Sequence, residues 1–181
     1  LKAPGIGGWR KDPAIQREPF IGGGCHAVDL VRWIAGDVHE VFAYSNHMML
    51  KDWPVDDCFI STMKFKSGVI GKVFVSIGCK RPYTMRSVFY GSEGTIISDN
   101  TSPSIQVYSS KLQDTLAFST IPVAINNHNV TAEIAELVHC ILEDKPVKTD
   151  ALEGMKTVAV CTAAVESSKK GAPVLVDDIL S

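Results

Sequence analysis

The sequence lacks the short motifs that mark several large classes of enzyme. No G-x-G-x-x-G follows a predicted strand and there is no Walker P-loop, so neither nucleotide-binding fingerprint is present. There is no G-x-S-x-G nucleophile elbow, and no two histidines stand at the H-E-x-x-H spacing. No apolar run approaches the roughly 20 residues that a membrane span needs. A membrane partner is therefore not expected.

Cysteine and net charge are also scarce. The five cysteines are scattered and never form a C-x-x-C pair, so we expect no disulfide framework, no metal site and a reducing, cytoplasmic setting. A net charge of -2 gives no reason to expect a nucleic-acid partner. With 181 residues, 45% of them hydrophobic, the chain can form a single domain (residues 1–181) with a sizeable core.

The first 21 residues contain several prolines and glycines and predict a loop with little regular structure. Trp9 and Arg10 stand out in it as a large aromatic side chain and a cation. In one interpretation Trp9 anchors the loop and Arg10 is a solvated charge. In the other, both line a site for a polar ligand, which makes them our candidates for substrate binding.

Residues 22–36 hold the greatest concentration of chemically useful side chains. Gly22, Gly23 and Gly24 disfavour a helix interior, so a helix is predicted to begin near Gly24 or Cys25 and to end at Gly36. Four apolar residues recur at helical spacing and predict its buried stripe: Ala27, Leu30, Val31 and Ile34.

His26 falls in the first turn of this helix, and Asp29 and Trp33 share its side. In one interpretation the glycines form a tight turn and His26 only makes local hydrogen bonds. In a second, the glycines let another molecule approach the backbone, His26 is a neutral proton acceptor at the helix N-terminus and Asp29 supports it. In a third, residues 22–24 form an anion nest, although no Lys, Ser or Thr follows at P-loop spacing. Spacing alone leaves the three open.

The middle of the chain reads as strands. Short turns at residues 66–68 and 91–94 join neighbouring strands, which must then be antiparallel, and we expect one meander. The predicted strands span residues 38–44, 58–65, 69–76, 87–90, 95–98, 104–108 and 116–120.

The last third reads as two helices. Asn129 is a plausible N-cap for the first, and Asp150 with Glu153 has capping-box spacing for the second, which ends at Gly171. Their predicted apolar stripes are Ile134, Leu137, Val138 and Ile141, then Met155, Val158, Ala159, Thr162 and Val165. The fold class expected is α+β, an open, predominantly antiparallel sheet with helices on one face. The other face needs cover, and a partner subunit would supply it.

Several of these segments resemble the C-terminal domain of the Gfo/Idh/MocA family. Residues 22–36 read G-G-G-x-H-x-x-D-L-x-R-W-x-x-G, similar to the signature that opens that domain. Residues 9–13 resemble the family's W-R-x-D-P, Asp56 and Asp57 lead a strand, and residues 91–94 resemble its G-x-x-G hairpin. Residues 164–174 are similar to its closing A-x-x-S-x-x-x-G-x-P-V. The resemblance covers essentially the whole chain.

This resemblance implies an NAD(P)-dependent oxidoreductase acting on a sugar, an inositol or a related polyol. The family has two domains, and the N-terminal Rossmann domain, which would bind most of the NAD or NADP, is absent from this chain. Leu1 is not an initiator Met, so we expect a fragment. Without the cofactor-binding half, this fragment should be inactive alone. The resemblance further implies that this domain supplies the substrate wall and an oligomer-forming sheet, as a homodimer or homotetramer.

The family's histidine at the position of His26 acts as acid and base on the substrate hydroxyl, and an aspartate stands four residues before it. Here that position is Gly22. Our hypothesis is hydride transfer, with His26 as the proton acceptor, Asp29 in support and residues 22–24 allowing cofactor and substrate to approach. The rival hypothesis is a non-catalytic ligand-binding and dimerisation module of the same fold, which the departure at Gly22 favours.

Overall fold

The computed structural model describes residues 12, 14, 17–112, 114–123 and 130–181. The chain divides into two compact units, which we describe separately. The first unit comprises residues 1–80 and 148–181, and the second comprises residues 81–147. Within the described residues no helix is long and apolar enough to cross a membrane.

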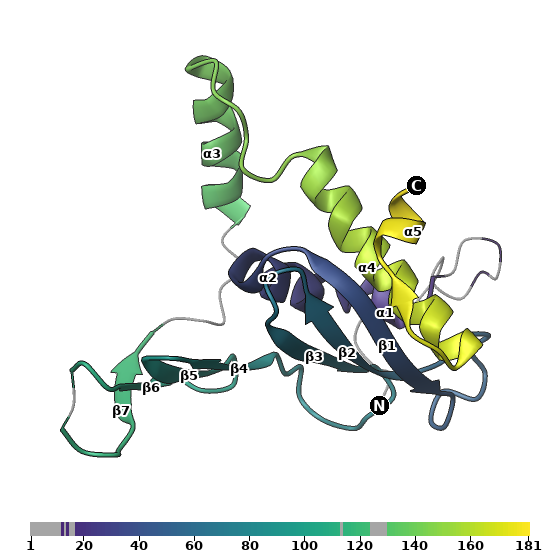
Figure 1. Ribbon diagram of the computed structural model, residues 1–181, viewed down its shortest axis with the longest axis horizontal. Helices are drawn as coiled ribbons and strands as arrows, with labels where there is room; N and C mark the ends of the chain where they lie inside the picture. Colours follow the sequence, from purple (N-terminus) through teal and green to yellow (C-terminus); the bar gives the residue numbers. More distant parts are fainter. Residues whose placement is uncertain (1–11, 13, 15–16, 113, 124–129) are drawn as a thin grey trace. The chain divides into compact units, whose positions relative to one another are not determined.

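The first unit is a four-stranded antiparallel sheet covered by helices on one face (Figure 1). The strand order is β3-β2-β1-β8. Its elements are α1 (Pro19–Gly22), α2 (Cys25–Ala35), β1 (Val38–Asn46), β2 (Cys58–Phe65), β3 (Ile70–Ser76), α4 (Ala151–Lys170), β8 (Val174–Leu175) and α5 (Asp177–Leu180). α4 packs on β1, while α1 and α2 contact β3.

Alternation along β2 shows how the sheet faces its core. Phe59, Met63 and Phe65 are buried under the helices, while the residues between them point to the other face. Phe59 packs against Phe20 of α1 with ring centroids 5.7 Å apart. Small residues of α4, such as Ala163, complete this core because they let the helix approach the sheet closely.

The opposite face of the same sheet is open and partly apolar. Tyr44, Ile60 and Phe74 are direct cross-strand neighbours in the register of β1, β2 and β3. Their exposed fractions are 66%, 40% and 55%. Helices thus cover only one face, as the sequence predicts.

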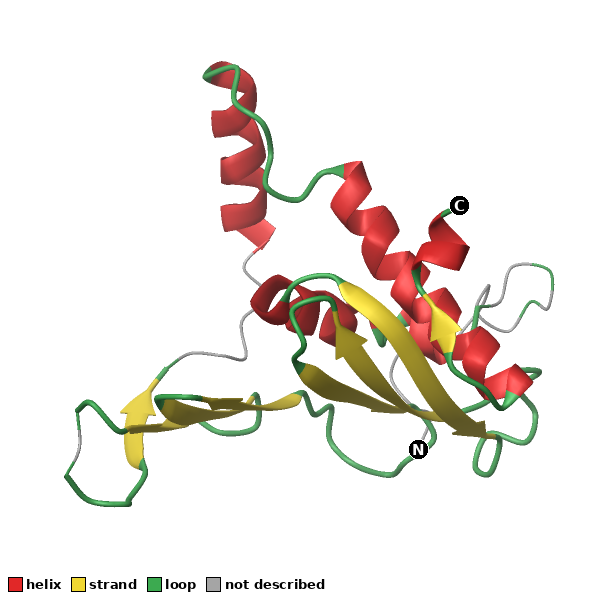
Figure 2. Cartoon of the chain, viewed as in Figure 1, coloured by secondary structure: helices red, strands yellow, loops and turns green. Residues whose placement is uncertain are grey.

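The second unit contains a separate antiparallel sheet of order β4-β5-β6-β7 and one helix. Figure 2 shows its four strands in yellow. The elements are β4 (Arg86–Gly91), β5 (Gly94–Asp99), β6 (Ser104–Ser109), β7 (Ser119–Pro122) and α3 (Val130–Leu142). None of these strand residues is buried.

The α+β class, the antiparallel pairing and the helices on one face are confirmed, but four details were wrong. The strands form two sheets rather than one meander, since β3 and β4 do not pair. The last strand of the second sheet is Ser119–Pro122 rather than residues 116–120. Residues 19–21, predicted as loop, belong to α1, because Pro19 occupies a first-turn position where its missing N–H costs nothing. Asn129 lies outside the described residues.

The fourth error concerns which helix faces are buried. On α4, Ala159 and Val165 are buried as predicted, but Met155 and Val158 are about half exposed. The rest of the buried face carries small and polar residues such as Thr157 and Ala164. On α2, Ala27 and Val31 pack on the core as predicted, but Ile34 is 55% exposed. The predicted α3 stripe also exists, but all four of its residues are exposed.

Candidate functional site

His26 lies in the first turn of α2 and is exposed to solvent. The helix runs for 11 residues from Cys25, directly after the three glycines, and ends where Gly36 adopts a positive φ of 90°. The imidazole is thus accessible to a ligand.

The three glycines differ in what surrounds them. A Cβ atom on Gly24 would lie 2.6 Å from the carbonyl oxygen of Phe20 and 2.9 Å from Cγ2 of Val75. Gly24 is therefore required for the close packing of α1, α2 and β3. Among the described residues, Gly22 has no atom within 4 Å of its Cβ position, and Gly23 has the Pro19 oxygen at 3.6 Å. Of the three glycines, Gly22 and Gly23 thus leave open space within the described structure at the start of α2.

Asp29 is engaged by α4 rather than by His26. Thr157 Oγ1 donates to Asp29 Oδ1 at 2.7 Å, and Arg32 Nη1 lies 4.0 Å from the same oxygen. Among the residues that the structure describes, no hydrogen bond or ion pair joins Asp29 to His26. Any support that Asp29 gives to His26 therefore passes through the backbone of α2.

Arg32 is the buried centre of a polar cluster between α2 and α4, with only 4% of its side chain exposed. Its guanidinium donates to Thr157 Oγ1 at 2.7 Å, to the Glu153 carbonyl at 3.1 Å, to Glu153 Oε2 at 3.0 Å and to Asp37 Oδ1 at 2.9 Å. A buried cation requires such partners, because an unpaired one would carry a large desolvation cost. Arg32 therefore fixes α2 on the start of α4.

Two carboxylates of this cluster, those of Asp37 and Glu153, are held ionised. A hydrogen bond from Arg32 is the main cause that lowers the pKa of Asp37, and one from Lys156 is the main cause that lowers the pKa of Glu153. Asp150 caps α4 by accepting from the Glu153 backbone N–H at 2.9 Å, as the capping-box spacing predicts. The Glu153 side chain pairs with Arg32 and Lys156, so the box is only half formed.

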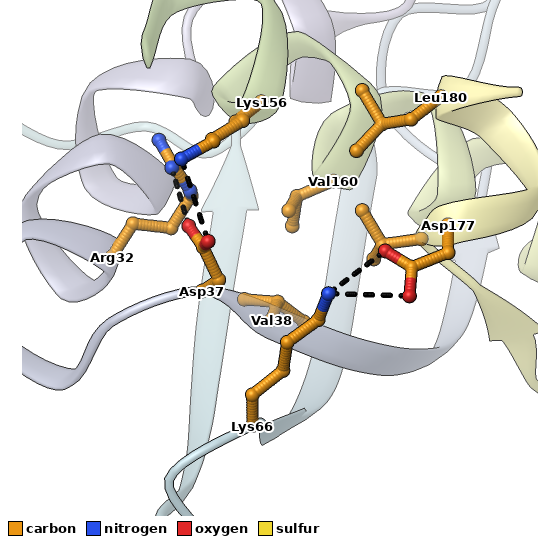
Figure 3. A pocket seen from close by; sticks show the side chains of 9 residues that line it. Arg32, Asp37, Val38, Lys66, Lys156, Val160, Asp177 and Leu180 are labelled. Atoms are coloured by element: carbon orange, nitrogen blue, oxygen red, sulfur yellow. Dashed lines mark hydrogen bonds and ion pairs between the residues drawn. The ribbon is translucent and has the colours of Figure 1, made fainter.

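A small pocket of about 100 Å³ opens beside this cluster. Figure 3 shows Lys66 paired with Asp177 on one side of it, and Asp37 with Arg32 and Lys156 on the other. Lys66 Nζ lies 2.9 Å from Asp177 Oδ1, and Lys156 Nζ lies 3.4 Å from Asp37 Oδ2. Each of these cations already has a carboxylate partner, so the charged groups of the lining have a structural explanation.

Two further groups, Asp57 and Cys161, also have structural explanations. Asp57, which belongs to the pair that leads β2, accepts from the backbone N–H groups of Met49 and Leu50 and so holds the preceding loop. Burial raises the pKa of the Cys161 thiol to about 12, which leaves it unreactive. Among the described residues no group of His, Cys, Asp and Glu side chains is arranged to hold a metal ion.

The structure places only part of the predicted site. His26, Asp29 and residues 22–24 lie together at the start of α2, whereas Trp9 and Arg10 lie outside the described residues. Sequence reasoning missed Thr157, which contacts Asp29, because a threonine within a predicted helix belongs to no recognisable motif.

Solved structures share this fold along almost the whole chain. A levoglucosan dehydrogenase in complex with NADH matches with a TM-score of 0.83 and 21% identity, over 96% of this chain and 54% of that one. An oxidoreductase domain protein from Kribbella flavida gives 0.81 and 22%, over 93% and 53%. An oxidoreductase from Agrobacterium radiobacter in complex with NAD+, L-tartaric acid and magnesium gives 0.73 and 20%, over 87% and 48%. The chain thus spans about half the length of these proteins.

The sequence comparisons differ in outcome. No curated protein sequence matches the chain, but a family model does. The profile described as "Oxidoreductase family, C-terminal alpha/beta domain" (GFO_IDH_MocA_C) matches residues 2–176, nearly the full length. Together with the fold, this match confirms the resemblance drawn from the motifs. The chain therefore belongs to the Gfo/Idh/MocA oxidoreductase family, whose C-terminal alpha/beta domain it matches.

Proposed function

We propose that the full-length protein transfers hydride between NAD(P) and a sugar-like or polyol-like substrate, and that residues 1–181 form its substrate-binding and oligomerisation domain. Membership of an oxidoreductase family supports the reaction class. Structural neighbours in complex with NADH and either L-sorbose or levoglucosan support the cofactor and the substrate class. The observation that carries the proposal is the exposed His26 beside the open edge at Gly22 and Gly23.

The start of α2 fits a dinucleotide-dependent reaction. Among the described residues, the open space at Gly22 and Gly23 suits the approach of a flat ring. Bound nicotinamide would supply the hydride acceptor, and an N-terminal Rossmann domain would hold most of the dinucleotide. His26 would take the proton of the substrate hydroxyl as its carbon is oxidised. Trp9 and Arg10 would contact the substrate, and the five free cysteines fit a cytoplasmic enzyme.

Full-length protein tests this proposal directly. Wild type, His26→Ala and the control His139→Ala, an exposed histidine on α3, would be assayed with NAD+ and NADP+ against levoglucosan, L-sorbose, D-glucose and myo-inositol. We expect His26→Ala to lower kcat/KM by a factor of about 10²–10⁴, the usual contribution of a general base. His139→Ala should retain wild-type rates. An unchanged kcat/KM in His26→Ala would remove the catalytic role.

The non-catalytic module is the second candidate, because Gly22 replaces the family's aspartate. Isothermal titration of full-length protein with NAD+ and NADP+ separates the two functions, since a module would bind neither cofactor. A Gly22→Asp variant adds a further measure, because the structure leaves room for its side chain. If His26 lacks a carboxylate partner, this variant should raise turnover.

The oligomerisation role rests on the open face of the first sheet. The exposed Tyr44, Ile60 and Phe74 form a contiguous apolar row, which a second copy of the chain would cover. Light scattering should show a dimer or tetramer for wild type and a monomer for Ile60→Lys. The matched control Asp178→Lys, on the exposed side of α5, should keep the wild-type mass. A monomeric wild type would contradict this role.

A further inference from the structure

One side chain outside the predicted site connects α2 to α4. Thr157 is buried, with 6% of its surface exposed, and its Oγ1 contacts two groups of α2. It lies 2.7 Å from Arg32 Nη1 and 2.7 Å from Asp29 Oδ1. A guanidinium can only donate and an ionised carboxylate can only accept. The hydroxyl therefore accepts from Arg32 and donates its single proton to Asp29, which fixes its orientation.

This arrangement restrains the turn of α2 that follows His26. Asp29 and Arg32 stand three residues apart, so they lie one above the other on the helix, and one hydroxyl binds both. The side chain of Asp29 is 58% exposed. Besides the hydrogen bond from Thr157, its only contact within the described part of the chain is the ion pair with Arg32 at 4.0 Å. The Thr157 hydroxyl is thus the main restraint on the Asp29 side chain.

We propose that Thr157 is a positioning residue for His26. Through Asp29 and Arg32 it fixes the first turns of α2 against α4, and so fixes the position of the backbone that carries His26. The proposal rests on the proposed function for its effect on rate, because the position of His26 matters to turnover only if His26 takes a proton from the substrate. Its effect on His26 itself does not depend on the reaction.

Three variants of the full-length protein test this role. Thr157→Val keeps the branched shape and removes the hydroxyl, and Thr157→Ser retains the hydroxyl. Thr162→Val is the matched control on the same helix, because among the described residues the Thr162 hydroxyl donates only to the Val158 carbonyl of its own helix. With NAD+ and the sugar of the panel above that turns over fastest, we expect kcat to fall about tenfold in Thr157→Val with little change in KM. Thr157→Ser should keep most of the wild-type kcat, and Thr162→Val should have the same kcat as wild type.

A second readout does not depend on turnover. In protein with ¹³C-labelled histidine, the ring resonance of His26 should shift in Thr157→Val and stay in place in Thr157→Ser and Thr162→Val. An unmoved His26 resonance in a folded Thr157→Val protein would overturn the proposal. A shifted resonance, together with wild-type turnover in His26→Ala, would keep the positioning role and reject the catalytic one, so the two failures are distinguishable.

Discussion

The two sheets of this chain have the same antiparallel pairing but differ in what covers them. In the first unit, helices bury Phe59 and Met63 of β2 to 1% and 2% exposure. In the second unit no strand residue is buried, although register places Phe89, Ile96 and Val107 on one face of the sheet. Backbone hydrogen bonds between strands therefore form both sheets, but only the first sheet has a hydrophobic core beneath it.

This difference shows where the sites of the molecule can be rigid. His26 stands on the covered unit, on a helix held by the buried Arg32, which suits a group whose direction matters. The second unit exposes Ile96 at 42% and Ile121 at 44%, both on the same face by register, which suits a surface that gains its cover by association.

The largest effect expected is in the core of the first unit. Phe59→Ala should lower the free energy of unfolding by about 3–5 kcal/mol, because it removes a buried ring and leaves a cavity beside Phe20. The matched change Ile96→Ala in the second sheet should cost less than about 1 kcal/mol. Urea titration followed by hydrogen exchange measures both units separately. Equal losses of unfolding free energy from Phe59→Ala and Ile96→Ala would contradict the expected difference between the two units.

A smaller effect distinguishes closely packed from open backbone within the first unit. Gly24→Ala should cost about 1–3 kcal/mol, since its Cβ would overlap the Phe20 carbonyl and the Val75 side chain. Gly22→Ala should be neutral or stabilise by about 0.5 kcal/mol, because its surroundings are open and alanine restricts the unfolded chain. Thermal unfolding of the two variants checks the order. A harmless Gly24→Ala would show that α1 and α2 are not closely packed.

The smallest expected effect is a loss of stability at low pH. The hydrogen bond from Arg32 lowers the pKa of Asp37 below its ordinary 3.8, so its stabilisation is present above pH 3.8 and is lost as the pH falls through the lower folded-state value. Asp37→Asn should therefore be less stable than wild type at pH 7, and the difference should vanish in acid.

The second unit supplies the comparison for this prediction. The pKa of Asp99 is also lowered, but by hydrogen bonds from Thr101 within its own turn. Asp99→Asn should therefore change local exchange near β5 without changing the unfolding midpoint of the first unit. Urea midpoints at pH 7 and along a series of falling pH, continued below the folded-state pKa of Asp37, test both variants. A persisting stability gap between wild type and Asp37→Asn well below the folded-state pKa would contradict the assignment.

The sequence predicted elements whose local signals agree with their packing. β2 begins and ends at the predicted Cys58 and Phe65, because alternation and a glycine turn both mark it. α4 begins after its predicted cap, Asp150. Its buried face was predicted only in part, because small residues such as Ala163 carry little hydrophobic signal yet allow a close approach to the sheet. Separate sheets could not be foreseen, since strand pairing depends on contacts between distant segments.

The site was predictable only where a motif marked it. The glycines and His26 form a local pattern, so their shared location could be read from the chain. Thr157 contacts Asp29 across 128 residues of sequence, and nothing in either segment announces that contact. Gly24 was predicted to allow a ligand to approach, but its environment shows that helix packing is sufficient reason for it.

The most direct test of the account is a crystal structure of the full-length protein with NAD+ and the sugar that it oxidises. The account predicts that the reacting hydroxyl lies about 3 Å from a ring nitrogen of His26, with the nicotinamide beside the open edge at Gly22 and Gly23. A sugar bound with its reacting carbon away from the start of α2, and with another side chain at its hydroxyl, would contradict it.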